Sequence, residues 1–161
     1  MLFRSVGQTP MQDSEDIKYM RLAIKQAQLA QASGEVPVGA LVVLDGAVIG
    51  TGHNGPIGNN DPSSHAEMVA IRSAAKHLNN YRMPGASLYV TLEPCLMCSG
   101  AIMHARISRL IYGAKDPKTG CVHSVLNVFE NKQLNHHAEI KGDVLSEECS
   151  EILKDFFRSR R

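Results

Sequence analysis

Two short segments of the chain combine residue types that bind metals and carry protons. One is the His-Ala-Glu sequence from His65 to Glu67, and the other is the Pro-Cys-Leu-Met-Cys sequence from Pro94 to Cys98. One imidazole and two thiolates are suitable zinc ligands, and three protein ligands leave the fourth tetrahedral position open for water. A carboxylate beside such a water can accept its proton and pass it to a leaving group. The two segments therefore predict a catalytic zinc site.

The segment around Glu67 also has the pattern of a helix start. Ser64 followed by Glu67 has the Ser-x-x-Glu form of a capping box, which predicts a helix that continues to Leu78. Taken alone, a glutamate at this position is more often a cap than a catalyst. Together with His65 and the later cysteine pair, however, Glu67 is better interpreted as a proton carrier than as a cap.

The cysteine pair is expected at a second helix start. Residues 87–92 have the pattern of a strand, and Pro94 suits the first turn of a helix that follows it. Cys95 and Cys98 would then share one face of that turn, where the positive end of the helix favours thiolates. Two helix starts at the edge of a sheet can bring both cysteines and His65 around one metal ion.

Two other interpretations of the cysteine pair remain open. Thioredoxin-like proteins also place a Cys-x-x-Cys pair after a strand and at a helix start, although redox exchange explains neither His65 nor Glu67. A purely structural zinc site would need a fourth protein ligand. Cys121 and His123 are the candidates for it, in a segment without knuckle-like spacing.

The rest of the chain alternates between helical and strand patterns, which is typical of a single α/β domain. Asp45-Gly46 separates two β-rich runs and predicts a tight hairpin. The other predicted elements are a helix from Asp13 or Ser14 to Gly34, strands at 38–44, 47–51, 110–113 and 139–144, an irregular loop at 53–63, a helical turn near 125–129 and a helix from Ser146.

Size and cysteine content favour one cytoplasmic domain. A chain of 161 residues can form a single core, and its four cysteines suit a metal motif in a reducing compartment. The longest apolar run, residues 36–44, is too short to cross a bilayer, and residues 1–13 lack the apolar core of a secretory signal. We expect residues 1–13 to be a flexible tail, residues 14–161 to form the domain, and no membrane segment.

The net charge of +1 argues against a generally basic nucleic-acid binder, so any polyanion must meet a local patch. Basic residues gather in two places, although solvated surface charge is the plain alternative. They are Arg106, Arg109, Lys115 and Lys118, set against Asp116 alone, and the terminal Arg158, Arg160 and Arg161.

His-x-Glu followed by Pro-Cys-x-x-Cys is the signature of zinc-dependent nucleobase deaminases. Over most of its length from about Ile17 the sequence resembles the zinc-dependent cytidine and nucleotide deaminase superfamily and, within it, the bacterial tRNA-specific adenosine deaminases. Besides the two metal segments, the blocks that carry the resemblance are 35–40, Asn54, 56–58, 61–62, 80–82, 88–95, 113–120 and 155–158.

This resemblance implies a three-layer α/β/α fold around a five-stranded mixed sheet, of the cytidine deaminase type, and a homodimer. It implies that the wobble adenosine of a tRNA anticodon stem-loop is converted to inosine by a zinc-bound hydroxide, with one Zn²⁺ per chain. His65, Cys95 and Cys98 would hold the metal, and Glu67 would carry protons. Asn54 would contact the extruded base with Pro56 and Ala66 beside it, and Asp116 would lie close to the RNA backbone.

Two functions other than tRNA adenosine deamination remain open. The metal motif alone would also suit a deaminase of guanine, cytosine or deoxycytidylate, and only residues 113–116 and 155–158 favour the tRNA enzyme. The basic residues would also suit a zinc-stabilised RNA-binding module without catalytic activity.

Overall fold

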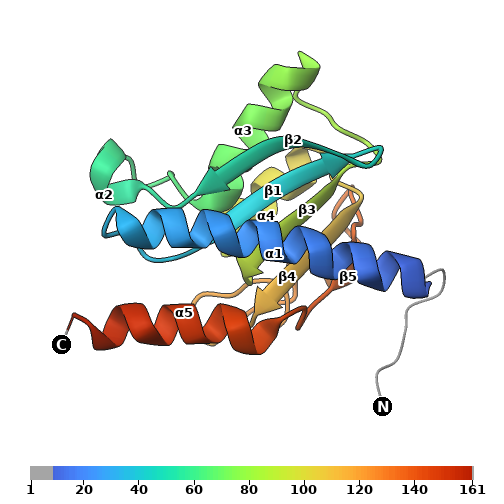
Figure 1. Ribbon diagram of the computed structural model, residues 1–161. Helices are drawn as coiled ribbons and strands as arrows, with labels where there is room; N and C mark the ends of the chain where they lie inside the picture. Colours follow the sequence, from blue (N-terminus) through green and yellow to red (C-terminus); the bar gives the residue numbers. More distant parts are fainter. Residues whose placement is uncertain (1–8, 161) are drawn as a thin grey trace.

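The computed structural model describes residues 9–160 and shows one sheet between two layers of helices (Figure 1). Helices α1 and α5 cover one face of the sheet, and α3 and α4 cover the other. The elements are α1 (Pro10–Ala32), β1 (Gly39–Leu44), β2 (Ala47–His53), α2 (Pro56–Asn59), α3 (Ala66–Leu78), β3 (Ser87–Leu92), α4 (Leu96–His104), β4 (Arg109–Ala114), the 3₁₀ helix η1 (Val128–Glu130), β5 (Glu139–Lys141) and α5 (Ser146–Arg158).

The five strands form a mixed sheet in the order β2-β1-β3-β4-β5. β1 is antiparallel to both of its neighbours, whereas β3, β4 and β5 are parallel. Asp45 and Gly46 join β1 to β2 with φ values of 50° and 76°, as a two-residue hairpin turn requires. The predicted hairpin and the three-layer mixed-sheet fold are therefore confirmed.

Alternating residues of the strands separate two hydrophobic cores, because successive side chains of a strand point to opposite faces. Leu41, Tyr89 and Ile111 pack with α1 and α5. Val42, Val90 and Leu110 pack with α3 and α4. Among the described residues no helix is long and apolar enough to cross a membrane.

The first helix starts earlier than its sequence pattern indicates. α1 begins at Pro10, and the side chain of Thr9 caps it by accepting a hydrogen bond from the Gln12 amide. Proline at the first helical position loses no intrahelical hydrogen bond, so the helix extends through residues expected in the tail. Residues 1–8 of the predicted flexible tail lie outside the described part of the chain.

The loop regions contain two short helices. Residues 56–59 form α2 inside the loop predicted as irregular, and η1 lies at residues 128–130 rather than near 125–129. The last strand covers only Glu139–Lys141 of the predicted 139–144. The strand is short because only residues 139–141 pair with β4, at the open edge of the sheet.

A buried ion network fastens α1 to β3, β4 and β5. Asp16 is fully buried and accepts hydrogen bonds from Tyr89 at 2.6 Å, from both terminal nitrogens of Arg109 at 3.1 Å and from Lys141 at 3.0 Å. Burial disfavours the charged form, but the bonds from Arg109, Tyr89 and Lys141 outweigh it and lower the pKa of Asp16 below its ordinary 3.8. The network therefore stabilises the fold with Asp16 ionised.

Asp16→Asn is expected to lower the free energy of unfolding by about 3 kcal/mol, because it leaves Arg109 and Lys141 without their buried counter-charge. Urea unfolding at pH 7 measures this loss. Glu148→Gln is the control, since the ion pair of Glu148 with Arg21 is exposed and worth less than about 1 kcal/mol. The ionised Asp16 carboxylate contributes its full stabilisation above its ordinary pKa of 3.8, so the difference between native protein and variant should shrink as the pH falls from 3.8 toward the lower pKa of the folded state. Equal effects of the two variants would contradict a stabilising role of the network.

Candidate metal and substrate site

The three predicted metal ligands lie together in the structure. The Nδ1 atom of His65 is 3.5 Å from the sulfur of Cys95 and 3.5 Å from the sulfur of Cys98, and all three ligand atoms lie within 4.8 Å of one another. Zinc–sulfur and zinc–nitrogen bonds of about 2.3 and 2.0 Å at the tetrahedral angle place N and S about 3.5 Å apart. The residues present therefore fit a zinc ion in both type and spacing.

The two sulfurs differ in their electrostatic surroundings. Hydrogen bonds from Cys98 and from His65 lower the pKa of the Cys95 thiol to about 4, although its partial burial acts in the opposite direction. The hydrogen bond to Cys95 and burial raise the pKa of the Cys98 thiol. The hydrogen bond with Cys95 raises the pKa of His65. Cys95 is thus a thiolate at neutral pH, and a cation in the cluster meets negative charge.

Glu67 lies next to these ligands and is buried, with 4% of its surface exposed. Burial raises the pKa of its carboxyl to about 7, and the nearby Cys95 charge acts in the same direction. A carboxyl group with a pKa near neutrality can both accept and donate a proton, as a general acid–base catalyst must. The position and the pKa of Glu67 therefore suit the predicted proton carrier.

The predicted capping box at the start of α3 is wrong. The N-cap is His65, without a side-chain cap, and the Ser64 hydroxyl instead accepts a hydrogen bond from Asn59. Asn54, from the end of β2, satisfies the first helical amide: its Oδ1 accepts a hydrogen bond from Ala66 at 2.9 Å. The Ser64 amide, which a capping box would pair with Glu67, donates instead to the Asp61 carbonyl.

Small residues bring α3 close to β2. A Cβ atom at Gly52 would lie 2.4 Å from the Ala66 carbonyl oxygen, and one at Gly50 would lie 2.4 Å from that of Ala70. The helix can approach the strand this closely only because these positions carry no side chain. The start of α3, with His65 and Glu67, is therefore held at a fixed depth against the sheet.

The second helix also starts differently from its pattern. α4 begins at Leu96, so Pro94 precedes the helix and Cys95 is its N-cap with an extended backbone. Cys98 lies in the first helical turn and is fully buried. The two sulfurs nevertheless both lie 3.5 Å from the Nδ1 atom of His65.

Cys121 and His123, the candidates for a fourth protein ligand, are not part of the cluster. Among residues 9–160, the group with metal-ligand geometry consists of His65, Cys95 and Cys98. The Cys121 thiol bonds to the Thr119 carbonyl, and His123 pairs with the Tyr112 hydroxyl at 2.6 Å. The described residues thus give three ligands and favour an open catalytic site over a closed structural one.

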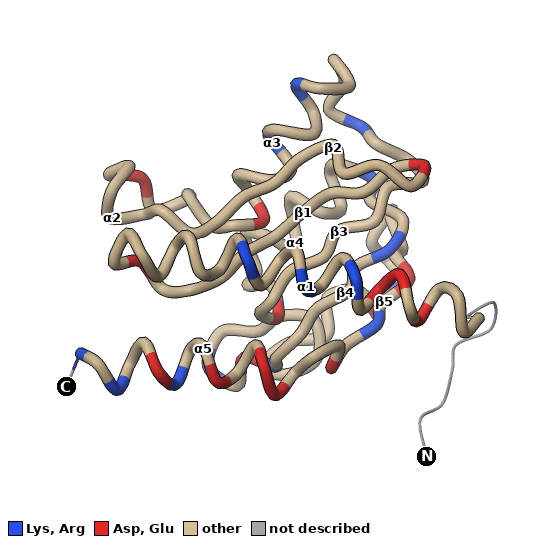
Figure 2. The backbone as a smooth tube through the Cα atoms, viewed as in Figure 1, with Lys and Arg blue, Asp and Glu red and all other residues tan. Residues whose placement is uncertain are grey.

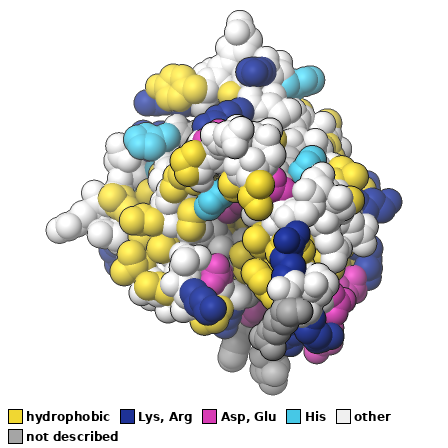
Figure 3. Space-filling model, turned by 90° about the vertical axis from the view of Figure 1, so that its left-hand side faces the viewer, with side chains coloured by type: hydrophobic (Ala, Val, Ile, Leu, Met, Phe, Trp, Pro, Cys, Tyr) yellow, Lys and Arg dark blue, Asp and Glu magenta, His cyan; other side chains and the backbone are white. Residues whose placement is uncertain are grey.

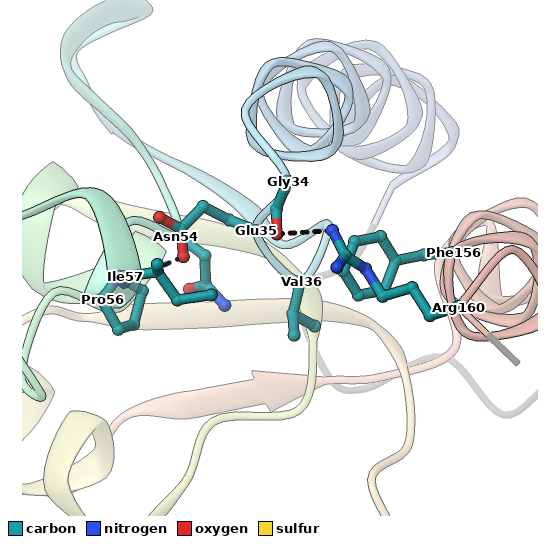
Figure 4. Close-up of a pocket in the computed structure, with 8 residues that line it drawn as sticks. All are labelled: Gly34, Glu35, Val36, Asn54, Pro56, Ile57, Phe156 and Arg160. Atoms are coloured by element: carbon teal, nitrogen blue, oxygen red, sulfur yellow. Dashed lines mark hydrogen bonds between the residues drawn. The ribbon is translucent and has the colours of Figure 1, made fainter.

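A shallow pocket of about 290 Å³ contains two of the predicted substrate-binding residues, Asn54 and Pro56 (Figure 4). Glu35 fixes one wall: its buried carboxylate accepts hydrogen bonds from the first amides of α2, those of Ile57 at 3.1 Å and Gly58 at 2.7 Å. The other residues that line the pocket are Gly34, Val36, Phe156 and Arg160.

The C-terminal end of α5 closes the opposite side of this pocket. The Arg160 guanidinium lies 4.3 Å from the centre of the Phe156 ring and donates a 2.8 Å hydrogen bond to the Gly34 carbonyl (Figure 4). Residues more than a hundred positions apart in sequence therefore form one concave surface.

The other two predicted substrate-binding residues differ in their accessibility. Ala66 is fully buried, and its amide is used by Asn54. Asp116 is partly exposed, and its carboxylate accepts hydrogen bonds from the amides of Lys118 and Thr119 and from the Thr119 hydroxyl. Asp116 therefore organises an exposed turn, while Ala66 holds Asn54 in place.

The predicted basic patch needs a correction at Arg109. Its side chain is only 14% exposed and pairs with Asp16 and Glu139 inside the buried network. Lys115 and Lys118 are exposed and Arg106 is partly exposed, whereas Arg161 lies outside the described residues.

Charge also changes sign along α5, from acidic at its start to basic near its end (Figure 2). On the face that carries α2 and the end of α5, hydrophobic side chains gather across the middle, with lysine and arginine mostly toward the rim (Figure 3). Such a surface offers both apolar contact for bases and positive charge for phosphates.

Sequence reasoning did not single out Glu93, which is 2% exposed. Its carboxylate accepts hydrogen bonds from Asp116, Val122, His123 and Ser124. Burial opposes its charge, but the hydrogen bonds from Ser124, His123 and Asp116 outweigh burial and lower its pKa to about 2. The sequence signal for it was a lone carboxylate at the end of a buried strand, directly before Pro94.

Known proteins resemble this chain over most of its length. A profile of the MafB19-like deaminases matches residues 14–161. The tRNA-specific adenosine deaminase of Haemophilus influenzae is 50% identical over 91% of this chain and 85% of that protein.

Solved structures of deaminases also resemble this chain. The structure of a tRNA:A34 deaminase, from work on A-to-I editing at the wobble position, matches with a TM-score of 0.82 at 46% identity, over 84% of this chain and 99% of that one. Guanine deaminase of Bacillus subtilis matches with a TM-score of 0.58 at 40% identity, over 61% of this chain and 63% of that one. The chain therefore belongs to the MafB19-like deaminase family and, within it, groups with the tRNA-specific adenosine deaminases.

Proposed function

We propose that this protein hydrolyses the wobble adenosine of a tRNA anticodon to inosine and ammonia. The observation that carries the proposal is the cluster of His65, Cys95 and Cys98 with the buried Glu67 beside it. The similarity to tRNA-specific adenosine deaminases along nearly the whole chain supports the choice of substrate.

His65, Cys95 and Cys98 would hold one zinc ion per chain. Zinc in this position would supply a Lewis acid that makes water nucleophilic near neutral pH. Glu67 accepts a proton from the attacking water and delivers protons to the adenine ring nitrogen and then to the departing amine. Its buried position excludes bulk water from these transfers, and a carboxyl pKa of about 7 suits both directions of transfer.

The substrate base must leave its stack to reach Glu67. Asn54 would contact this base through its amide nitrogen, since its oxygen is already used by Ala66. Pro56 would pack on the base as part of the wall that Glu35 fixes. The Asp116 turn would lie against the RNA backbone, with Lys115 and Lys118 beside it.

The proposal includes a homodimer in the cytoplasm. Large hydrophobic side chains are exposed between the two cysteine ligands and in the loop before η1, and a second copy of the chain would cover them. Four free cysteines, two of them metal ligands, are compatible with a reducing compartment. The exposed residues are Leu96, Met97, Val125 and Leu126.

Ammonia release from an anticodon stem-loop tests the function. We expect turnover with the RNA that carries adenosine at the wobble position, and none with the same RNA carrying guanosine there. Free adenosine, cytidine and guanine are the small-molecule controls. Release from guanine without release from RNA would replace the proposed substrate by a free base, and release from no substrate would leave an RNA-binding module.

A further inference from the structure

One buried side chain, Glu93, links both ends of the loop from Lys115 to Ser124 to the metal-ligand segment. Glu93 Oε1 accepts hydrogen bonds from the Asp116 amide at 3.1 Å and from the Ser124 hydroxyl. Oε2 accepts from the amides of Val122 at 3.1 Å, His123 at 2.8 Å and Ser124 at 2.9 Å. Five donors from both ends of the loop therefore converge on a single carboxylate.

The loop approaches this carboxylate as closely as its backbone permits. A Cβ atom at Gly120 would lie 2.4 Å from the carboxyl carbon of Glu93. The Cys121 amide donates a 2.9 Å hydrogen bond to the carbonyl of Pro94, the residue before the ligand Cys95. The loop is thus fixed directly beside the metal site.

The same loop presents positive charge to solvent. Lys115 and Lys118 are exposed, and the Asp116 carboxylate is occupied by the amides and the hydroxyl of its own turn. The lysines are therefore the part of this loop suited to RNA phosphates. Their distance from the metal site depends on how Glu93 holds the turn.

We propose that Glu93 is a positioning residue for RNA binding: it fixes the Lys115–Ser124 loop so that its two lysines meet the substrate backbone while the base reaches Glu67. This inference rests on the proposed function. Glu93 is buried and, among the described residues, lies outside the group that could hold the metal, so its replacement should weaken the binding of RNA and leave the chemical step unchanged.

Glu93→Gln is the sharpest variant for a test. The glutamine oxygen can still accept the three amide hydrogen bonds made at Oε2, and the glutamine NH₂ group can donate to the Ser124 hydroxyl. The NH₂ group cannot accept a hydrogen bond from the Asp116 amide, however, so that bond is lost. We expect the KM for an anticodon stem-loop to rise about tenfold, with kcat and zinc content unchanged. The dependence of log KM on log salt should also become shallower by about one, as expected when one or two phosphate contacts are lost.

A double-mutant cycle with Lys118→Ala shows whether Glu93 acts through the loop. The effects of the two substitutions on KM should be non-additive. Once Glu93→Gln has displaced Lys118 from the RNA, replacing that lysine by alanine removes little further binding free energy. Glu151→Gln, an exposed glutamate on α5, is the matched control and should leave both constants unchanged. If Glu93→Gln does not fold, Ser124→Ala removes one donor and should raise KM two- to threefold with the same non-additivity.

A fall in kcat at unchanged KM, or additive effects in the cycle, would overturn the positioning role of Glu93. Turnover of the RNA by the native protein would still support the proposed function in that case. A native protein that binds zinc but does not act on RNA would overturn both.

Discussion

Glu67→Ala is expected to lower kcat for the anticodon stem-loop by at least about 10³-fold while zinc remains at one per chain. The carboxylate is buried beside the predicted metal ligands, where it can carry protons, and general acid–base groups contribute about 10² to 10⁴-fold to rates. Single-turnover inosine formation measures the rate, and elemental analysis of the purified protein measures the zinc.

Glu67→Gln is the matched control for shape. It keeps the volume of the side chain but cannot exchange protons, so its rate should fall nearly as far. A zinc-loaded Glu67→Ala protein that deaminates at the native rate would remove Glu67 from the proton transfers.

Cys98→Ala is expected to abolish both zinc binding and turnover. With only His65 and Cys95 left, the site has two protein ligands, too few for a stable zinc site. Elemental analysis should show well under one zinc per chain. Circular dichroism should show that the helices and the sheet are retained, because the two hydrophobic cores do not depend on the metal.

Cys121→Ala separates the open site from a structural one. The Cys121 thiol lies outside the ligand cluster and bonds to the Thr119 carbonyl, so this variant should keep one zinc per chain. Loss of zinc from Cys121→Ala would instead make Cys121 a fourth ligand and argue against catalysis.

Local sequence patterns predicted most of the scaffold. Asp45-Gly46 predicted the hairpin because these residues adopt a positive φ at low cost. The helix predicted from Ser146 is α5, and its Cys149 and Phe156 are buried. The predicted boundaries of α1 and β5 differ from those of the structure, since they depend on a cap at Thr9 and on the pairing of a short edge strand.

Several roles were decided by contacts between distant parts of the chain. Arg109 has the sequence appearance of a surface charge but pairs with Asp16, which lies in the first helix. No local sequence pattern around Glu93 predicts the hydrogen bonds that its carboxylate accepts from residues 116–124. No sequence window of helix or strand length contains both partners of such a contact.

The sequence by itself determined the chemistry that we propose for the site, because His65, Glu67, Cys95 and Cys98 are the residue types that a zinc deaminase would need as metal ligands and proton carrier. Only the tertiary structure decided how they are held. Asn54 rather than Ser64 caps the helix that carries Glu67, since the end of β2 brings its side-chain oxygen to the first free amide. A backbone donor is satisfied by whichever acceptor the fold places within reach, and that acceptor need not be a neighbour in sequence.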